Sequence, residues 1–329
     1  MRLDDIGFHT LTDGRAKNTS VSSPLWRLCF LVTGRCNFSC PYCNGLRCND
    51  DMDFGFFKGV LDDAAQNHAL KNVRFSGGEP TLHPRLVDMI KEARKCGTVD
   101  RIAISTNGFA DFSLYDSLVA AGANDFSISC DSCDPDVVAE LAGGVKNAWE
   151  RVSGNLVALS KISNVMAGIT VSEKNLHDVR DVVERLDAMG VADMKLSTST
   201  HFNGAIPGLE SISSEILDRH PVLKYRVRNF LAGRNVRGLR EGDCGKCMLV
   251  QDEIIVMGDK HYPCIVHARE QAANAIGDVK SVAEMRKERL AWAIGRDSHL
   301  DPVCKKFCMD IFLDCNNRIE HFARERIGK

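Results

Sequence analysis

Cysteines are the residues of this 329-residue chain most able to do chemistry, because most of its 14 fall into three groups of three. Closely spaced thiolates are ligands for zinc and for iron–sulfur clusters. The groups are Cys36, Cys40 and Cys43, then Cys244, Cys247 and Cys264, and finally Cys304, Cys308 and Cys315. Metal binding is therefore the first chemistry to expect.

A group of three cysteines differs from a group of four because it leaves a metal coordination position open. A structural zinc site closes with four ligands, whereas a cubic iron–sulfur cluster held by three thiolates keeps one iron free. The first group has the spacing C-x3-C-x2-C after an apolar run and fits zinc poorly. Cys244 and Cys247 form a C-x2-C pair that suits zinc as well as iron, so zinc stays an alternative at the second site.

Composition excludes several classes of protein. The 42 Lys and Arg residues nearly balance the 44 Asp and Glu residues, so no net field attracts nucleic acid or a membrane surface. No stretch approaches the roughly 20 apolar residues of a membrane span, and Met1–Thr10 carries charges where a signal peptide would be apolar. We expect a cytoplasmic protein, in which disulfides are disfavoured.

Apolar runs alternate with amphipathic segments of helical length, which predicts parallel β/α units. The strands are expected at Leu28–Val32, Asn72–Ser76, Arg101–Ser105, Asp125–Ser129, Val165–Val171 and Asp193–Ser197. The helices are expected at Phe54–His68, Pro84–Lys95, Asp111–Ala121, Ala148–Leu159 and Asp178–Met189. The strand runs are nearly continuous, as in strands buried on both faces.

Polar motifs follow four of these strands, at the ends where β/α folds place their ligands. The first cysteine group follows the first strand, and Gly77-Gly78-Glu79-Pro80 follows the second. Thr106-Asn107-Gly108 follows the third and Cys130-Asp131-Ser132 the fourth. Each turn by itself is ordinary loop sequence. Together, behind a C-x3-C-x2-C group, they favour one shared site.

These motifs resemble the radical S-adenosylmethionine (SAM) superfamily, in the branch with the GTP cyclase of molybdenum-cofactor synthesis and the auxiliary-cluster (SPASM and twitch) maturases. The resemblance covers Leu28 to Thr200 well and continues more weakly to Cys264. It implies an α/β fold, a partial (β/α)6 TIM-like barrel followed by a small cysteine-rich cluster domain. We expect an N-terminal extension over 1–24, the barrel over 25–203 and the auxiliary-cluster domain over 204–329.

The resemblance also implies cofactors and their ligands. Cys36, Cys40 and Cys43 are expected to hold a [4Fe–4S] cluster whose free iron binds SAM. Glycines allow close backbone approach, a carboxylate binds the methionyl ammonium, an aromatic ring packs near adenine, and polar side chains bind ribose. The residues expected in these cofactor-binding roles are Gly77, Gly78, Glu79, Tyr42, Ser105, Asn107 and Asp131.

The second cysteine group resembles the auxiliary-cluster segment of the same branch. A strand over Asp252–Met257 and a turn at Gly258-Asp259-Lys260 would fold Cys264 back beside Cys247. We expect one auxiliary [4Fe–4S] cluster, with a fourth ligand from Cys304, Cys308 or Cys315, or with none. The neighbouring His261, His267 and His299 are alternative ligands, although packing or surface roles are commoner for histidine.

Two features depart from the resemblance or add to it. Cys130 stands where relatives more often have an apolar residue or Thr; it is a candidate hydrogen-atom donor to a substrate radical, or a small buried hydrophobe. A set of basic residues lies just before the second cysteine group in the sequence. Such side chains are suited to bind a phosphate or a carboxylate. The set comprises Lys195, Arg226, Arg228, Arg234, Arg237 and Arg240.

The implied function is reductive cleavage of SAM to a 5′-deoxyadenosyl radical, which abstracts hydrogen from a substrate. The outcome would be dehydrogenation, epimerisation or cyclisation of a small molecule such as a nucleotide, sugar or antibiotic precursor. Flavodoxin or ferredoxin would donate electrons. A peptide maturase is the alternative enzyme, disfavoured because no leader-binding domain precedes Leu28. A non-catalytic zinc or iron-cluster interaction module is the alternative from another class.

Overall fold

Six parallel strands form the centre of the protein in a computed structural model that describes residues 2–45, 47–200, 202, 204–270 and 274–327. Each strand pairs with its neighbour in the chain. Their bounds are β1 Arg27–Thr33, β2 Asn72–Gly77, β3 Arg101–Thr106, β4 Asp125–Ser129, β5 Asn164–Val171 and β6 Asp193–Thr198. The six strands predicted from the sequence are all present.

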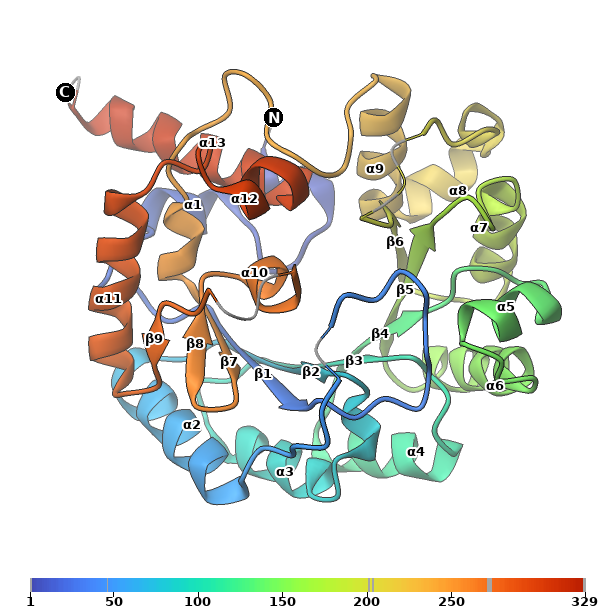
Figure 1. The fold of residues 1–329 in the computed structure, drawn as a ribbon, viewed down its shortest axis with the longest axis horizontal. Coiled ribbons are helices and arrows are strands. Elements are labelled where there is room, and N and C mark those ends of the chain that lie inside the picture. The colour runs from blue at the N-terminus through green and yellow to red at the C-terminus, as the bar shows by residue number, and fades with distance from the viewer. Residues whose placement is uncertain (1, 46, 201, 203, 271–273, 328–329) are drawn as a thin grey trace.

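Helices cover the outer face of this curved sheet (Figure 1). They are α2 Phe54–His68, α3 Leu86–Lys95, α4 Phe112–Ala121, α5 Pro135–Leu141, α6 Ala148–Ser160 and α7 Val179–Ala188. The short α5 was not predicted from the sequence. It begins where the Asp134 carboxylate accepts hydrogen bonds from the N–H groups of Asp136 and Val137, with Pro135 in its first turn.

The two faces of the strands differ in burial. In β3 and β5 buried residues alternate with partly exposed ones, because one face packs under the helices and the other lines the barrel interior. The expectation of strands buried on both faces is wrong for these strands. The inward positions, among them Ser105 and Thr170, border a cavity. The barrel interior is therefore open to ligands.

The C-terminal part of the chain continues the same sheet. Strand β7 (Glu253–Met257) pairs in parallel with β1, and β8 (Lys260–Tyr262) and β9 (Gly277–Asp278) follow in antiparallel order. The nine strands run β6-β5-β4-β3-β2-β1-β7-β8-β9, and the sheet does not close. The turn between β7 and β8 contains Gly258 at a φ of 58°.

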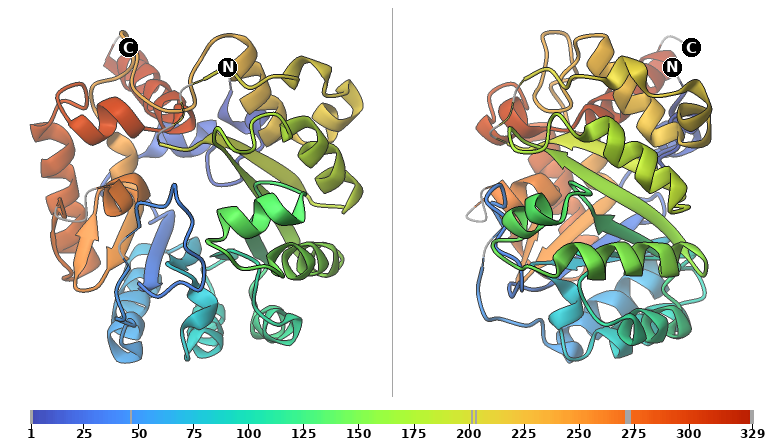
Figure 2. Two further views of the ribbon diagram at one scale, coloured as in Figure 1. Left: turned by 45° about the vertical axis from the view of Figure 1, so that its right-hand side comes forward. Right: turned by 90° about the vertical axis from the view of Figure 1, so that its right-hand side faces the viewer.

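A second group of helices lies by the open edge of the sheet, and it stays on one side of the sheet in the further views (Figure 2). The N-terminal segment packs there too, with α1 on α13. The elements are η1 Leu3–Ile6, α1 Asp13–Asn18, α8 Ser214–Arg219, α9 Pro221–Leu231, α10 Ile265–Glu270, α11 Val282–Gly295, α12 Pro302–Phe307 and α13 Asp310–Ile327. Over the described residues, no helix has the length and apolar character needed to cross a membrane.

A buried ion pair joins α9 to the start of α13. The side chains of Arg226 and Asp310 are both fully buried, and the Asp310 carboxylate also accepts a hydrogen bond from Asn229 Nδ2 at 2.7 Å. We expect Asp310→Ala to lower the free energy of unfolding by about 3–5 kcal/mol, because it leaves a buried guanidinium uncompensated. Urea unfolding followed by circular dichroism measures this. The double variant Arg226→Met/Asp310→Leu should recover most of the loss, and failure to recover would show that the charges themselves are required.

Candidate active site and auxiliary metal centre

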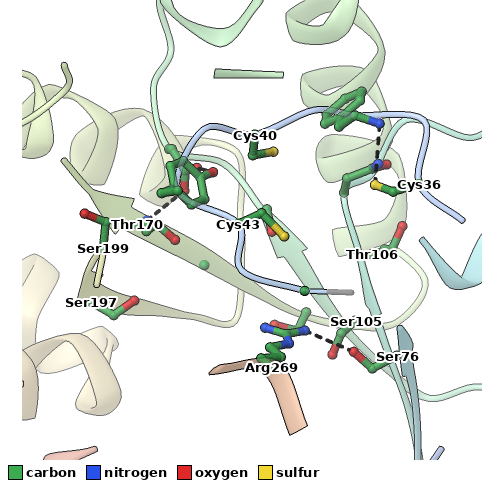
Figure 3. A pocket seen from close by; sticks show the side chains of 18 of the residues that line it. Cys36, Cys40, Cys43, Ser76, Ser105, Thr106, Thr170, Ser197, Ser199 and Arg269 are labelled. Atoms are coloured by element: carbon green, nitrogen blue, oxygen red, sulfur yellow. Dashed lines mark hydrogen bonds between the residues drawn. The ribbon is translucent and has the colours of Figure 1, made fainter. Parts of the chain in front are cut away.

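The first cysteine group lies on the loop between β1 and α2, at the carboxyl end of the sheet. Cys36, Cys40 and Cys43 are free thiols that line a cavity of about 360 Å³ among the strand ends and α10 (Figure 3). Burial raises the pKa of Cys36, and it raises the pKa of Cys40 to about 11. Three free thiols that line one cavity fit a metal cluster, which binds them as thiolates.

The two glycines after β2 let this turn pack against the cysteine loop. Gly77 has a φ of 143°, and a Cβ on it would lie 2.3 Å from the carbonyl oxygen of Thr33. A Cβ on Gly78 would lie 2.2 Å from the carbonyl oxygen of Arg35. A side chain at either position would therefore push the cysteine loop away from the strand ends.

The carboxylate of Glu79 is buried at the cavity wall and held by four donors. Its Oε1 accepts hydrogen bonds from Thr81 and from the Thr106 hydroxyl at 2.7 Å, and its Oε2 accepts one from the Asn107 N–H at 2.7 Å. Burial raises the pKa of Glu79 although these hydrogen bonds oppose the shift. Oε2 has a single protein donor and keeps acceptor capacity for a ligand ammonium.

Tyr42 and Asp131 connect the cysteine loop to the end of β4. The Tyr42 hydroxyl donates a hydrogen bond to Asp131, which also accepts one from the Thr170 N–H at 2.7 Å. Burial raises the pKa of Asp131 to about 6, and it raises the pKa of Tyr42 as well. Cys130, next to Asp131, is buried and lines the same cavity, and its thiol donates a hydrogen bond to the Ser132 carbonyl at 3.6 Å.

The remaining predicted cofactor-binding residues also line this cavity. The Ser105 hydroxyl accepts a hydrogen bond from Arg74 Nε at 2.8 Å, and the Asn107 side chain donates one to Asn37 at 2.7 Å. Sequence reasoning missed Arg74 and Arg269, which both line the cavity. The signal for Arg74 was its spacing from Ser76, since residues two apart on a strand share a face.

Four cysteines from two distant segments line a second, smaller and mostly apolar cavity. They are Cys247, Cys264, Cys304 and Cys308. Burial raises the pKa of all four thiols, that of Cys264 to about 12. Asn316 donates a hydrogen bond to the sulfur of Cys247 at 3.4 Å. Cys244 and Cys315 were also predicted for this centre, but neither lines the cavity. Cys315 is buried in an apolar cluster with Leu249, Val266 and Val303, here called the second apolar core, and Cys247 and Cys264 pack against the same cluster.

Arg289 holds the backbone around this second cavity. Its buried guanidinium donates hydrogen bonds to four carbonyl groups, those of Val250, Glu253, Tyr262 and Pro263. Burial lowers the pKa of Arg289 to about 10. Nothing in the sequence distinguished it from an exposed arginine of an amphipathic helix.

His267 is the histidine nearest to the second cysteine cavity. Its Nε2 lies 3.5 Å from the sulfur of Cys304, and donor atoms of His267, Asp301 and Cys304 all lie within 4.8 Å of one another. The other two candidates have protein partners, since His261 contacts Glu288 at 3.0 Å and His299 contacts the Asp243 carbonyl at 2.9 Å.

Residues 30–186 match the family model described as the Radical SAM superfamily. The chain contains a radical SAM domain. It is 25% identical to a probable GTP 3′,8-cyclase of Methanothermobacter marburgensis over 81% of this chain and 94% of that protein. A tungsten-containing aldehyde ferredoxin oxidoreductase cofactor-modifying protein of Pyrococcus furiosus is 44% identical, over 23% of this chain and 22% of that protein.

Solved structures agree with the fold of this radical SAM protein. SuiB of Streptococcus suis bound to S-adenosylmethionine superposes with a TM-score of 0.57 and 16% identity, over 86% of this chain and 67% of that chain. The protein anSMEcpe with bound AdoMet superposes with a TM-score of 0.55 and 15% identity, over 92% of this chain and 98% of that chain. These two structures confirm the predicted partial-barrel α/β fold, whereas the predicted radical SAM domain is supported by the family model and the cyclase relative. The cofactors of this family are a [4Fe–4S] cluster and SAM.

Proposed function

We propose that this radical SAM protein abstracts hydrogen from a small-molecule substrate held in the cavity beside the cysteine loop. The observation that carries the proposal is the convergence of three free thiols, a buried carboxylate and polar strand ends on one cavity. The 25% identity to a probable GTP 3′,8-cyclase along almost the whole of that protein supports a small molecule over a peptide.

The donor set fits the family's cofactors. Cys36, Cys40 and Cys43 would each coordinate one iron of the [4Fe–4S] cluster. The fourth iron is then free to bind the amino and carboxylate groups of SAM. When bound, the pair supplies reductive cleavage of SAM to methionine and a hydrogen-abstracting 5′-deoxyadenosyl radical. Flavodoxin or ferredoxin is the electron donor we expect, in the cytoplasm.

The protein's own groups orient the SAM molecule. Oε2 of Glu79 accepts a hydrogen bond from the methionyl ammonium, because the Thr106 and Asn107 donors keep its carboxylate fixed. The Ser105 hydroxyl and the Asn107 amide lie on the next strand end and bind ribose hydroxyls. Tyr42, held by Asp131, packs beside adenine. These contacts pre-organise SAM before any electron arrives.

The second cavity is proposed to hold one auxiliary [4Fe–4S] cluster with Cys247, Cys264, Cys304 and Cys308 as ligands. Four thiolates would coordinate all four irons of the cluster. This cluster would therefore serve structure or electron transfer, because no iron is left to bind substrate. This set is narrower than the one predicted from the sequence, because Cys244 and Cys315 lie outside the cavity. Zinc on His267, Asp301 and Cys304 is the alternative occupant.

Cys130 determines one fate of the substrate radical. Its buried thiol at the cavity wall would donate a hydrogen atom to the substrate radical, which completes an epimerisation and leaves a thiyl radical on Cys130. One electron from flavodoxin or ferredoxin and one proton would then restore the thiol. Loss of an electron from the substrate radical would instead give dehydrogenation or cyclisation. The Cys130→Ala variant separates these outcomes when the reaction runs in deuterated water. If Cys130 is the donor, the unaltered protein places deuterium in the product, whereas the variant still abstracts hydrogen but returns none.

Anaerobic incubation with SAM and dithionite tests the proposed function. We expect the reconstituted protein to be brown, to contain iron and sulfide without stoichiometric zinc, and to release 5′-deoxyadenosine, which chromatography with mass detection measures. A protein that binds zinc in stoichiometric amount and releases no 5′-deoxyadenosine would be the non-catalytic interaction module instead.

A further inference from the structure

Five cationic side chains line the cavity beside the cysteine loop. Arg47 lies on that loop and donates a hydrogen bond to Ser39 Oγ at 2.7 Å. The other four are Arg74 on β2, Lys195 on β6, Arg237 in the segment after α9 and Arg269 on α10. The fold brings them together from positions spread over almost 200 residues of sequence. In the view of Figure 3, Arg269 lies below the cysteine loop with Ser76 and Ser105.

These four cations lack the carboxylate partners that neighbouring arginines have. Arg226, Arg234 and Arg240 form ion pairs with aspartates of the C-terminal part. Among the described residues, no carboxylate lies within ion-pair distance of these four cations. Three of them donate to neutral oxygens: Arg74 to Ser105, Arg237 to the Thr198 carbonyl at 2.9 Å, and Arg269 to Ser76 at 3.3 Å.

Three acidic side chains of the same cavity compensate only part of this charge. Glu79 accepts hydrogen bonds from Thr81, Thr106 and Asn107, and Asp131 from Tyr42 and Thr170. Glu270 accepts a hydrogen bond from Asn44 Nδ2 at 2.7 Å, and its charge stabilises the charged form of Arg237. The cations outnumber the carboxylates of this cavity, so positive charge remains for a ligand to balance.

Lys195 is half-buried in the cavity wall and has no ion-pair partner there. No hydrogen bond from its ammonium group is found within the described part of the chain. Burial, together with repulsion from Arg226, Arg74, Arg237 and Arg269, lowers the pKa of Lys195 well below its usual value. Buried cations kept for structure are normally paired, whereas unpaired ones in a cavity are typical of a binding site.

Hydroxyl groups complete the lining around the cations. They belong to Ser76, Ser127, Ser129, Ser197 and Ser199. A hydroxyl can donate to an anionic oxygen, and an arginine fork matches the two oxygens of a phosphate or a carboxylate. The floor thus offers both charge and hydrogen-bond donors to one strongly anionic group.

We propose that the substrate carries a multiply charged anionic group, a phosphate or clustered carboxylates, and that Arg74, Lys195, Arg237 and Arg269 bind this group. The inference rests on the proposed function in one respect, that this cavity holds the substrate. A ligand gripped by its anionic end at the floor extends toward the cysteine loop, so the reacting carbon lies at the end remote from the charge. Neutral sugars and uncharged peptides are excluded as substrates.

Isothermal titration of the reconstituted, SAM-loaded protein with pyrophosphate and with citrate tests this proposal, with glycerol as the neutral probe. We expect one of the two anions to bind one-to-one and Lys195→Met to weaken it by at least about tenfold, because a charge-assisted hydrogen bond is lost. The matched control is Lys161→Met, at the exposed end of α6, which should not change the affinity. Pyrophosphate as the ligand assigns a phosphate, and citrate assigns carboxylates.

Thermal unfolding supplies a second readout that a structural role for Lys195 would not produce. Without added anion, Lys195→Met should raise the Tm, because it removes a half-buried positive charge that other cations repel. A lower Tm would show that Lys195 is structural and would overturn the proposal. The proposal is also overturned if neither anion binds. It is overturned as well if Lys195→Met and Arg74→Met bind the anion as tightly as the unaltered protein does. Release of 5′-deoxyadenosine by the unaltered protein is measured separately, so failure of the proposed function is distinguishable from failure of this inference.

Discussion

Replacing Cys36, Cys40 and Cys43 together by alanine is expected to abolish 5′-deoxyadenosine formation. The three thiols share one loop and one cavity, and without them no protein ligand holds the cluster that SAM must join. The measurement is product release under anaerobic conditions with dithionite, by chromatography, at equal protein concentration.

A matched control removes a cysteine that has no part in the cavity. Cys96 lies at the end of α3 and does not line either cavity, so Cys96→Ala should release 5′-deoxyadenosine as the unaltered protein does. Circular dichroism of the triple variant establishes that it is folded. Persistent SAM cleavage by a folded triple variant would contradict the assignment of these cysteines.

Replacing Cys308 by alanine is expected to remove the auxiliary cluster while leaving the first cysteine loop intact. Cys308 lines the second cavity with Cys247, Cys264 and Cys304, and loss of one of four ligands exposes an iron to solvent. With two cubes present in the unaltered protein, iron content should fall from about eight to about four atoms per chain. Iron analysis and electron paramagnetic resonance of the reduced protein measure the change.

Cys244 and Cys315 provide the controls for this second prediction. Cys315→Ala removes a buried thiol from the second apolar core, and Cys244→Ala removes a partly exposed one, yet neither lines the cavity. Both variants should keep about eight iron atoms per chain if two four-iron cubes are present. Iron loss in Cys244→Ala with retention in Cys308→Ala would reverse the proposed ligand set. Zinc recovered in place of iron would favour the His267, Asp301 and Cys304 site.

The sequence by itself determined the order and the ends of the barrel elements. Apolar runs separated by amphipathic segments are local signals, so β1 to β6 and the main helices lie where they were predicted. The same signals placed the motifs with Cys36, Gly77, Asn107 and Asp131 at strand ends. Since parallel strands end at one edge of a sheet, these residues must lie close together.

Only the tertiary structure decided which later residues meet. Cys304 and Cys308 are four residues apart and line one cavity, whereas Cys315 lies beyond the turn into α13 and does not line it. The direction of that turn depends on packing between distant segments. The floor of the first cavity depends on packing in the same way, because Lys195 and Arg269 come from elements that local sequence does not orient toward each other. Periodicity specifies an element and its faces; the partner of each face is determined by the long-range contacts that bury it.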